Sequence, residues 1–194
     1  MGREKFIEFQ TGAIFTAAAA LLILPLSFLL SFVTAASIHE LCHYLMLTLT
    51  NVNVHRISVG PFGAVMETDA MDTESELLCA LAGPAGSLLL VSCYRYIPEI
   101  ALCAFVQGCF NLLPFYPMDG GRVIKGILEL LKIPKSDRIL DIIRLLTGLT
   151  VAWTCLYGFW KWNLGFGMLI LGAMVLLRTL QRKTPCKDWP FGVQ

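Results

Sequence analysis

Three ionisable side chains lie close together in the run His39-Glu40-Leu41-Cys42-His43. His39 and His43 are four residues apart, so on a helix both imidazoles point to the same face. Two neutral imidazoles placed in this way can share a zinc ion. A glutamate beside the first of them can take the proton of a water that the ion activates. The spacing therefore predicts a zinc site in which Glu40 is the acid/base of a hydrolysis.

The surroundings of this run favour a metal. The run lies within an apolar stretch, and a membrane interior penalises every ionisable group that it contains. A polar cluster bonded to a neighbouring helix is the alternative, but a shared metal is the simplest partner for all three groups. Catalytic zinc usually has three protein ligands and one open position. We therefore expect a third ligand at a similar depth.

The sequence offers three sources of that third ligand. His55 follows the apolar stretch, an acidic patch occupies 67–76, and Asp119 follows a later apolar segment. Asp119 is favoured by topology, because the second and fourth apolar segments run in the same direction and end on the same side. The alternative for Asp119 and the two glycines after it is an ordinary turn, for which these residues are well suited. Spacing alone does not separate these two interpretations.

The apolar content of the chain indicates a membrane protein. Of its 194 residues, 56% are hydrophobic and 15% charged, and the mean hydropathy is +0.68. The net charge of +1 argues against nucleic acid as the main partner. The seven cysteines lie mostly inside apolar runs, which indicates packing in helices rather than a disulfide framework. The basic start is not expected to be a cleaved signal peptide, because the apolar sequence continues after it.

The apolar segments predict about six transmembrane helices. They lie near 8–24, 26–49, 73–92, 99–113, 143–160 and 164–180. Pro25 separates the first two, since proline interrupts a helix interior, and Thr73 with Glu76 fits a capping box that starts the third. Residues 122–142 are mixed and charged, as in an amphipathic or loop region. Trp160 and Trp162 are expected in the turn between the last two spans.

The segment 51–68 differs from its apolar neighbours. It contains β-branched residues and then Gly60, Pro61 and Gly63, which predicts a short β-hairpin or re-entrant loop. The expected fold class is thus an all-α polytopic membrane protein with about six transmembrane helices and a short membrane-associated β-hairpin after the second.

The distribution of basic residues predicts an orientation. With six spans, 13 of the 15 lysines and arginines fall on the side of the termini, and only Arg95 and Lys161 fall on the other. The positive-inside rule then places both termini in the cytoplasm and the zinc site toward the cytoplasmic side.

Two motifs together resemble the site-2 protease family of intramembrane zinc metalloproteases. HELCH at 39–43 fits the HExxH of that family, and NLLPFYPMDGG at 111–121 fits its N-x-x-P-x-x-P-x-D-G motif. The hairpin at 61–63 and the Ala-Gly-Pro at 82–84 also look like family features, so the resemblance covers about 25–125. The six-span layout is nearest to the branch that contains the stage IV sporulation protease, which activates a sporulation sigma factor.

The resemblance implies a set of site residues. His39, His43 and Asp119 would bind Zn2+, Glu40 would be the catalytic acid/base, and Asn111 would act near the substrate or oxyanion. Independently, a carboxamide inside an apolar span can donate to a developing oxyanion. An interhelical hydrogen bond is an equal alternative for Asn111.

Some positions depart from the family pattern. Cys42 stands where the family usually has glycine, and we expect it to pack rather than approach the zinc, because its helix angle points away from the histidine face. No PDZ-like insertion fits between the spans, and the tail at 181–194 is too short for a nucleotide-sensing domain.

These observations predict a single membrane-embedded metalloprotease domain over 1–194, with a catalytic core at about 25–125 and additional helices at about 143–180. The expected function is a zinc-dependent intramembrane endopeptidase, a hydrolase acting on peptide bonds. Its substrate would be a transmembrane or membrane-associated protein, such as a regulatory or sporulation factor precursor. The hairpin would pair with the extended substrate. The lipid bilayer is the other expected partner, and a regulatory membrane protein or a homo-oligomer stays open.

The alternative is a non-catalytic zinc-binding membrane scaffold or a small transporter. Glu40 argues against both, because holding a metal does not need it. A transporter is also expected to show paired polar spans or an internal repeat, and the sequence shows neither.

Overall fold

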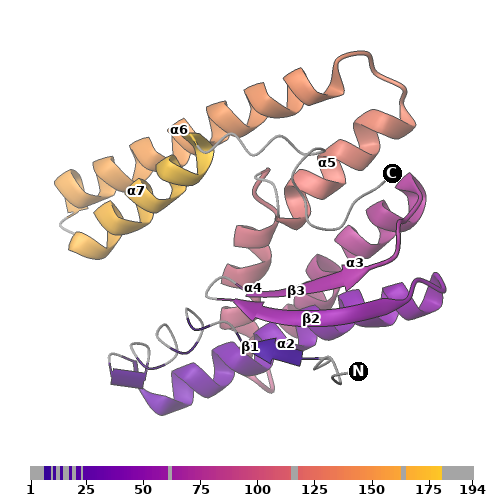
Figure 1. Cartoon of the computed structure of the whole chain (residues 1–194). Helices are drawn as coiled ribbons and strands as arrows, with labels where there is room; N and C mark the ends of the chain where they lie inside the picture. The colour runs from indigo at the N-terminus through magenta and orange to yellow at the C-terminus, as the bar shows by residue number, and fades with distance from the viewer. Residues whose placement is uncertain are drawn as a thin grey trace. The chain divides into compact units, whose positions relative to one another are not determined.

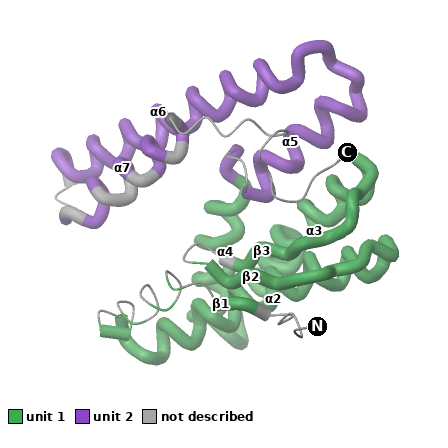
Figure 2. The backbone as a smooth tube through the Cα atoms, viewed as in Figure 1, with its two compact units in different colours: residues 1–112, 190–194 green, residues 113–189 purple. Residues whose placement is uncertain are grey.

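The structure is a computed structural model that describes residues 7–9, 11, 14, 18, 21–22, 24–60, 63–114, 118–162 and 165–180. The chain forms a small sheet and a series of helices (Figure 1). It divides into two compact units, 1–112 with 190–194 and 113–189 (Figure 2). The single domain expected over 1–194 stays a prediction.

Three helices form the core of the first unit. They are α2 (Leu26–Leu49), α3 (Thr73–Ser92) and α4 (Pro98–Asn111), and each packs against the other two. Small side chains allow this packing, because Ala35 and Ala104 are fully buried and Cys103 is nearly so. The bounds of α2 and α3 are those predicted for the second and third apolar segments.

The capping residue of α3 differs by one position from the prediction. The N-cap is Asp72, whose carboxylate accepts a hydrogen bond from the Ser75 backbone N–H at 3.3 Å, and not Thr73. The backbone of Asp72 is extended, and an aspartate there also places a negative charge at the positive end of the helix dipole. Pro84 lies inside α3 without ending it, as neighbouring helices allow in membrane proteins.

A three-stranded sheet accompanies these helices. β2 (Val54–Gly60) and β3 (Gly63–Thr68) pair antiparallel directly after α2, and β1 (Ile7–Phe9) pairs parallel with the other edge of β2. Arg56 of β2 lies 3.3 Å from the Glu8 carboxylate of β1. The first span was expected to begin at residue 8, and this start is wrong because residues 8 and 9 belong to a strand.

Parts of several predictions lie outside the described residues. They are most of the first span at 8–24, the hairpin tip at 61–62, the middle of the second motif at 115–117, and the tail at 181–194. The association of the hairpin with a membrane stays a prediction.

The second unit consists of α5 (Asp119–Leu130), α6 (Ser136–Trp162) and α7 (Phe166–Leu180). The segment 122–142 is therefore mostly helical, and α6 begins before the predicted fifth span. The predicted place of Trp160 and Trp162 is wrong, because both belong to the end of α6. That helix continues through both tryptophans, and the Trp160 side chain is exposed.

Three of the described helices are long and apolar enough to cross a membrane: α2, α3, and α6 over Ser136–Lys161. These helices, together with the apolar composition, indicate an integral membrane protein. With 14 and 15 residues, α4 and α7 are shorter than the roughly 20 residues that a spanning helix needs. The layout of six spans and the orientation of the termini stay predictions.

Candidate metal centre

The two predicted histidine ligands lie on one buried face of α2. This face repeats every fourth residue, and its members are Ser31, Ala35, His39, His43 and Leu47. His39 is 1% exposed and His43 is 7% exposed. Their Nε2 atoms are 3.3 Å apart, and the two rings meet edge to face. The helical repeat therefore brings together the two nitrogens that the spacing predicted.

The α3 backbone fixes the proton of His43. Its Nδ1 lies 2.7 Å from the carbonyl oxygen of Cys79. A carbonyl can only accept a hydrogen bond, so Nδ1 carries the proton and donates it. In the neutral ring, Nε2 then keeps the lone pair that can bind a metal.

His39 has polar neighbours at both ring nitrogens. Its Nδ1 lies 2.9 Å from Ser87 Oγ, and its Nε2 lies 2.9 Å from the amide nitrogen of Asn111. An amide nitrogen donates, so with the carboxamide in this orientation Nε2 accepts. The proton of His39 is then on Nδ1 and is donated to Ser87. Both histidines thus present a basic Nε2 at the same place.

The spacing of these nitrogens fits a zinc ion. Zinc binds imidazole nitrogen at about 2.0–2.1 Å with tetrahedral angles, which places two such nitrogens about 3.3–3.4 Å apart. The observed separation of the Nε2 atoms of His39 and His43 is 3.3 Å. The two rings therefore already have the spacing of a zinc-binding pair.

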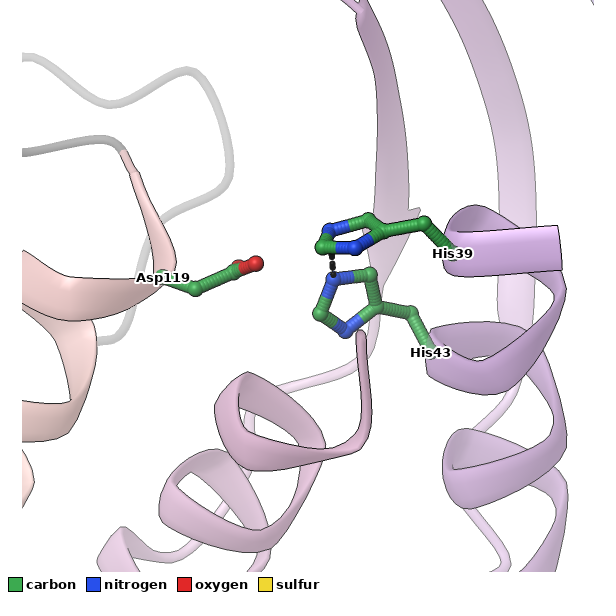
Figure 3. A group of neighbouring side chains, drawn as sticks. All are labelled: His39, His43 and Asp119. Carbon is green, nitrogen blue, oxygen red and sulfur yellow. Dashed lines mark hydrogen bonds between the residues drawn. The ribbon is translucent and has the colours of Figure 1, made fainter. Parts of the chain in front are cut away.

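Asp119, the predicted third ligand, is the first residue of α5 and is 7% exposed. In the part of the chain that the structure describes, it forms with His39 and His43 the one group of three potential ligands that could hold a metal ion. One ligand atom from each side chain lies within 4.8 Å of the other two (Figure 3).

The two other sources of a third ligand have different partners. His55 is exposed on β2, and its Nε2 lies 2.6 Å from Asp69 Oδ1. Asn53 donates to the other carboxylate oxygen of Asp69 at 2.9 Å. The hydrogen bonds from His55 and Asn53 lower the pKa of Asp69, and the hydrogen bond from Ser75 lowers the pKa of Asp72 in the same patch. Asp69 therefore joins residues at the base of the hairpin, and Asp72 caps α3.

The contact of Gly83 with the two histidine rings was not predicted from the sequence. A Cβ atom at this position of α3 would overlap His43 Nε2 and lie 2.6 Å from His39 Nε2. The absent side chain of Gly83 therefore leaves space beside both metal-facing nitrogens. The Ala-Gly-Pro at 82–84 was the available signal, but small residues in a membrane helix are usually interpreted as helix packing.

Gly86, one turn further along α3, accommodates Cys42. A Cβ atom at Gly86 would overlap the Cys42 sulfur and lie 3.1 Å from its Cβ. The prediction that Cys42 packs is thus confirmed. The reason given for it is wrong, because Cys42 faces α3 just as the histidines do. Three residues of α2 therefore meet two glycines of α3.

Glu40 and Asn111 lie on the elements expected of them. Glu40 follows His39 on α2 and is half-buried. Asn111 is the last residue of α4, and its amide approaches the nitrogen of His39 that would bind the metal. The alternative of an interhelical hydrogen bond is therefore observed for Asn111, and this bond lies at the metal-facing side of the ring.

Several known proteins are similar to this chain in sequence or in structure. No family model matches the sequence. The chain is 31% identical over 116 residues to the zinc metalloprotease MJ0392 of Methanocaldococcus jannaschii. This match covers 53% of this chain and 34% of that protein. It is 29% identical over 109 residues to Rip3 of Mycobacterium tuberculosis, which is described as a candidate zinc metalloprotease. That match covers 46% of this chain and 28% of Rip3.

Among solved structures, the chain is similar to the site-2 protease from Methanocaldococcus jannaschii. The TM-score is 0.65 and the identity 21%, over 97% of this chain and 96% of that one. This chain has the fold of a site-2 protease. The resemblance found in the two motifs is thus confirmed by sequence and by fold. The matches to the curated relatives span only about a third of their length.

Proposed function

We propose that this chain is a zinc-dependent endopeptidase that cuts a substrate protein in or beside its membrane segment. The observation that carries this proposal is the buried pair of His39 and His43, whose Nε2 atoms face each other at 3.3 Å while both Nδ1 atoms are held. The names of the curated relatives support zinc as the metal, and the site-2 protease fold supports a membrane setting.

The proposed zinc ligands are His39, His43 and Asp119. Two imidazoles and one carboxylate are a donor set typical of catalytic zinc, which keeps a further position for water or substrate. Asp119 supports this role, since it is 7% exposed and offers a carboxylate oxygen within 4.8 Å of a ligand atom of each histidine. A zinc ion bound there would polarise the scissile carbonyl and make a water acidic.

Glu40 and Asn111 are the proposed catalytic residues. The Glu40 carboxylate takes the proton of the attacking water and passes it to the nitrogen of the leaving amine. Asn111 holds an amide donor at the metal-facing side of His39. Once the His39 lone pair is engaged, that N–H is available to donate to the oxyanion that develops on the scissile carbonyl.

The sheet supports a way of presenting the substrate. Helical backbone shields its carbonyls, so the cleaved segment must be extended. In the order β1-β2-β3, the strand β1 already pairs with one edge of β2, and β3 forms the opposite edge of the described sheet. An extended substrate segment would add to β3 through backbone hydrogen bonds. The proposed substrate contact is therefore the β3 edge alone, whereas the sequence predicted the hairpin as a whole.

The orientation and the number of spans belong to the same proposal. Both termini and the site face the cytoplasm, and the spans number about six. The position within the stage IV sporulation branch and a sporulation factor precursor as substrate rest on the resemblance alone.

The test compares wild type with Glu40→Gln, using Glu74→Gln on the exposed first turn of α3 as the matched control. Each full chain is co-expressed with candidate single-span or membrane-anchored proteins, and shortened products are detected by immunoblotting. The zinc content of each purified protein is measured in parallel. We expect zinc in all three proteins and cleavage only by wild type and Glu74→Gln.

Two outcomes would contradict the proposal at different levels. Retained cleavage by Glu40→Gln would refute Glu40 as the base. Wild type without zinc, with cleavage unaffected by His39→Ala, would refute the whole scheme. A zinc-loaded wild type that cleaves none of the candidates would favour the scaffold.

A further inference from the structure

Ser87 of α3 is a buried polar residue that the two family motifs do not include. Its side chain is 2% exposed, and its Oγ lies 2.9 Å from His39 Nδ1. It comes one turn after Gly83, the residue that leaves space at the metal-facing nitrogens. The same helix therefore meets His39 from the side opposite to its metal-binding nitrogen.

The position of the hydroxyl is restricted from a third helix. A Cβ atom at Gly108 of α4 would lie 3.1 Å from Ser87 Cβ and 3.6 Å from its Oγ. The lack of a side chain at Gly108 lets α4 approach Ser87 closely, so Ser87 is enclosed by α2 and α4 as well as by its own helix. A larger side chain at 87 would have to displace one of them.

The environment of Ser92 in the same helix shows what an ordinary helical serine does. Its hydroxyl donates to the carbonyl of Leu88 one turn back, at 3.1 Å, and the residue is exposed. Such a bond satisfies the hydroxyl within its own helix. The bond of Ser87 instead joins two helices through residues that are 48 positions apart in the sequence, and its other end is the ring of His39.

We propose that Ser87 is a positioning residue for the metal centre. Its oxygen accepts a hydrogen bond from the Nδ1–H of His39. This bond keeps the lone pair on Nε2 and sets the orientation of the ring. Removing the hydrogen-bond partner of a metal-binding histidine typically lowers metal affinity or activity by about 10- to 100-fold. The inference rests on the proposed zinc site and adds a side chain that none of the motifs assigns.

The test measures metal binding by the full chain purified in detergent. Zinc affinity is determined by competition with a coloured chelator, and the coordination geometry is followed in the visible spectrum of the Co2+-loaded protein. The variants are Ser87→Ala and Ser92→Ala, the second as the matched loss of a hydroxyl from the same helix.

We expect Ser87→Ala to bind zinc about 10- to 100-fold more weakly and to change the Co2+ spectrum. Ser92→Ala should bind as wild type does, because its hydroxyl bonds to its own helix. If Ser87→Ala does not fold, Ser87→Cys carries the same comparison, because it keeps the volume and offers only a weak acceptor.

The outcomes separate this inference from the proposed function. Wild type that binds no zinc would refute the zinc site itself. Wild type that binds zinc, with Ser87→Ala or Ser87→Cys equal to it in affinity and spectrum, would refute only the role of Ser87. It would then act in helix packing alone.

Discussion

The histidines of this chain occupy two contrasting environments. His39 and His43 are buried between helices, and each has an acceptor at Nδ1 that leaves Nε2 for a metal. His55 is exposed on β2 and uses its Nε2 on the carboxylate of Asp69. The comparison teaches that burial, together with the ring nitrogen that is engaged, distinguishes a histidine that could bind a metal from one that ties a hairpin together.

The largest effect is expected from Gly83→Ala. The new methyl group would overlap His43 Nε2 and crowd His39 Nε2, so the two rings could not keep the spacing that zinc needs. We expect zinc binding to fall at least 100-fold and cleavage to be lost. Helix formation is not the cause, because alanine is favoured over glycine inside a helix by about 1 kcal/mol. Chelator competition on purified protein measures the loss.

A Gly83→Ala protein that is folded and binds zinc as tightly as wild type would contradict this prediction. It would also remove the contrast with His55, since crowding the buried pair would then have no consequence for the metal.

A smaller effect is expected from Gly86→Ala one turn away. Here the methyl group would overlap the sulfur of Cys42, and the three atoms nearest to it belong to Cys42 and Ile38 rather than to a histidine. Overpacking of this kind costs about 1–3 kcal/mol of stability, and zinc affinity should change much less than in Gly83→Ala. Thermal unfolding in detergent measures the destabilisation.

The double variant Gly86→Ala with Cys42→Ala provides the control for this pair. Removing the sulfur should recover stability, and the interaction energy of the cycle should be clearly favourable. If the two substitutions are simply additive, the packing of Cys42 against Gly86 is not what limits this position.

The smallest effect is expected from His55→Ala. Hydrogen bonds from His55 and Asn53 hold the pKa of Asp69 below its ordinary value of 3.8. A lowered pKa means that these bonds stabilise the folded state at pH values above the unfolded-state pKa. This stabilisation is lost as the pH falls through the folded-state pKa. We therefore expect the base of the hairpin to loosen only in acid, below about pH 4.

In His55→Ala the pKa of Asp69 should rise toward its ordinary value while zinc affinity at neutral pH stays unchanged. Carboxyl carbon shifts in NMR follow the titration, and chelator competition follows the zinc. Loss of zinc from His55→Ala would show that the exposed histidine contributes to the site after all.

The sequence predicted the pairing of His39 with His43 better than it predicted what surrounds them. The four-residue spacing of His39 and His43 was sufficient for the buried pair, because a helix places such residues on one face whatever the rest of the fold. The bounds of α2 and α3 were predicted correctly for the same local reason. Pro25 precedes the first of these helices, and polar residues precede the start of the second at Thr73. These predictions depend on neighbouring residues only.

Contacts between distant segments were the part that could not be predicted. The strand β1 depends on the pairing of residues 7–9 with residues 57–59, which no local pattern indicates. The role of Gly83 depends on which helix faces α2, and the wrong direction assigned to Cys42 has the same cause. Ser87 is an ordinary residue in its own helix, and only the packing of α2 and α4 against it gives it a specific partner.

The buried face of α2 places the two histidines nearer to one end of the helix than to the other. At about 1.5 Å per residue, His43 is roughly 9 Å from the Leu49 end of the helix, whereas His39 is roughly 20 Å from the Leu26 end. A water molecule approaching along this helix thus has a path from the Leu49 end about half as long as from the other. Strand β2 begins five residues beyond that same end. Hydrolysis at this site would therefore draw its water from the side on which the hairpin emerges.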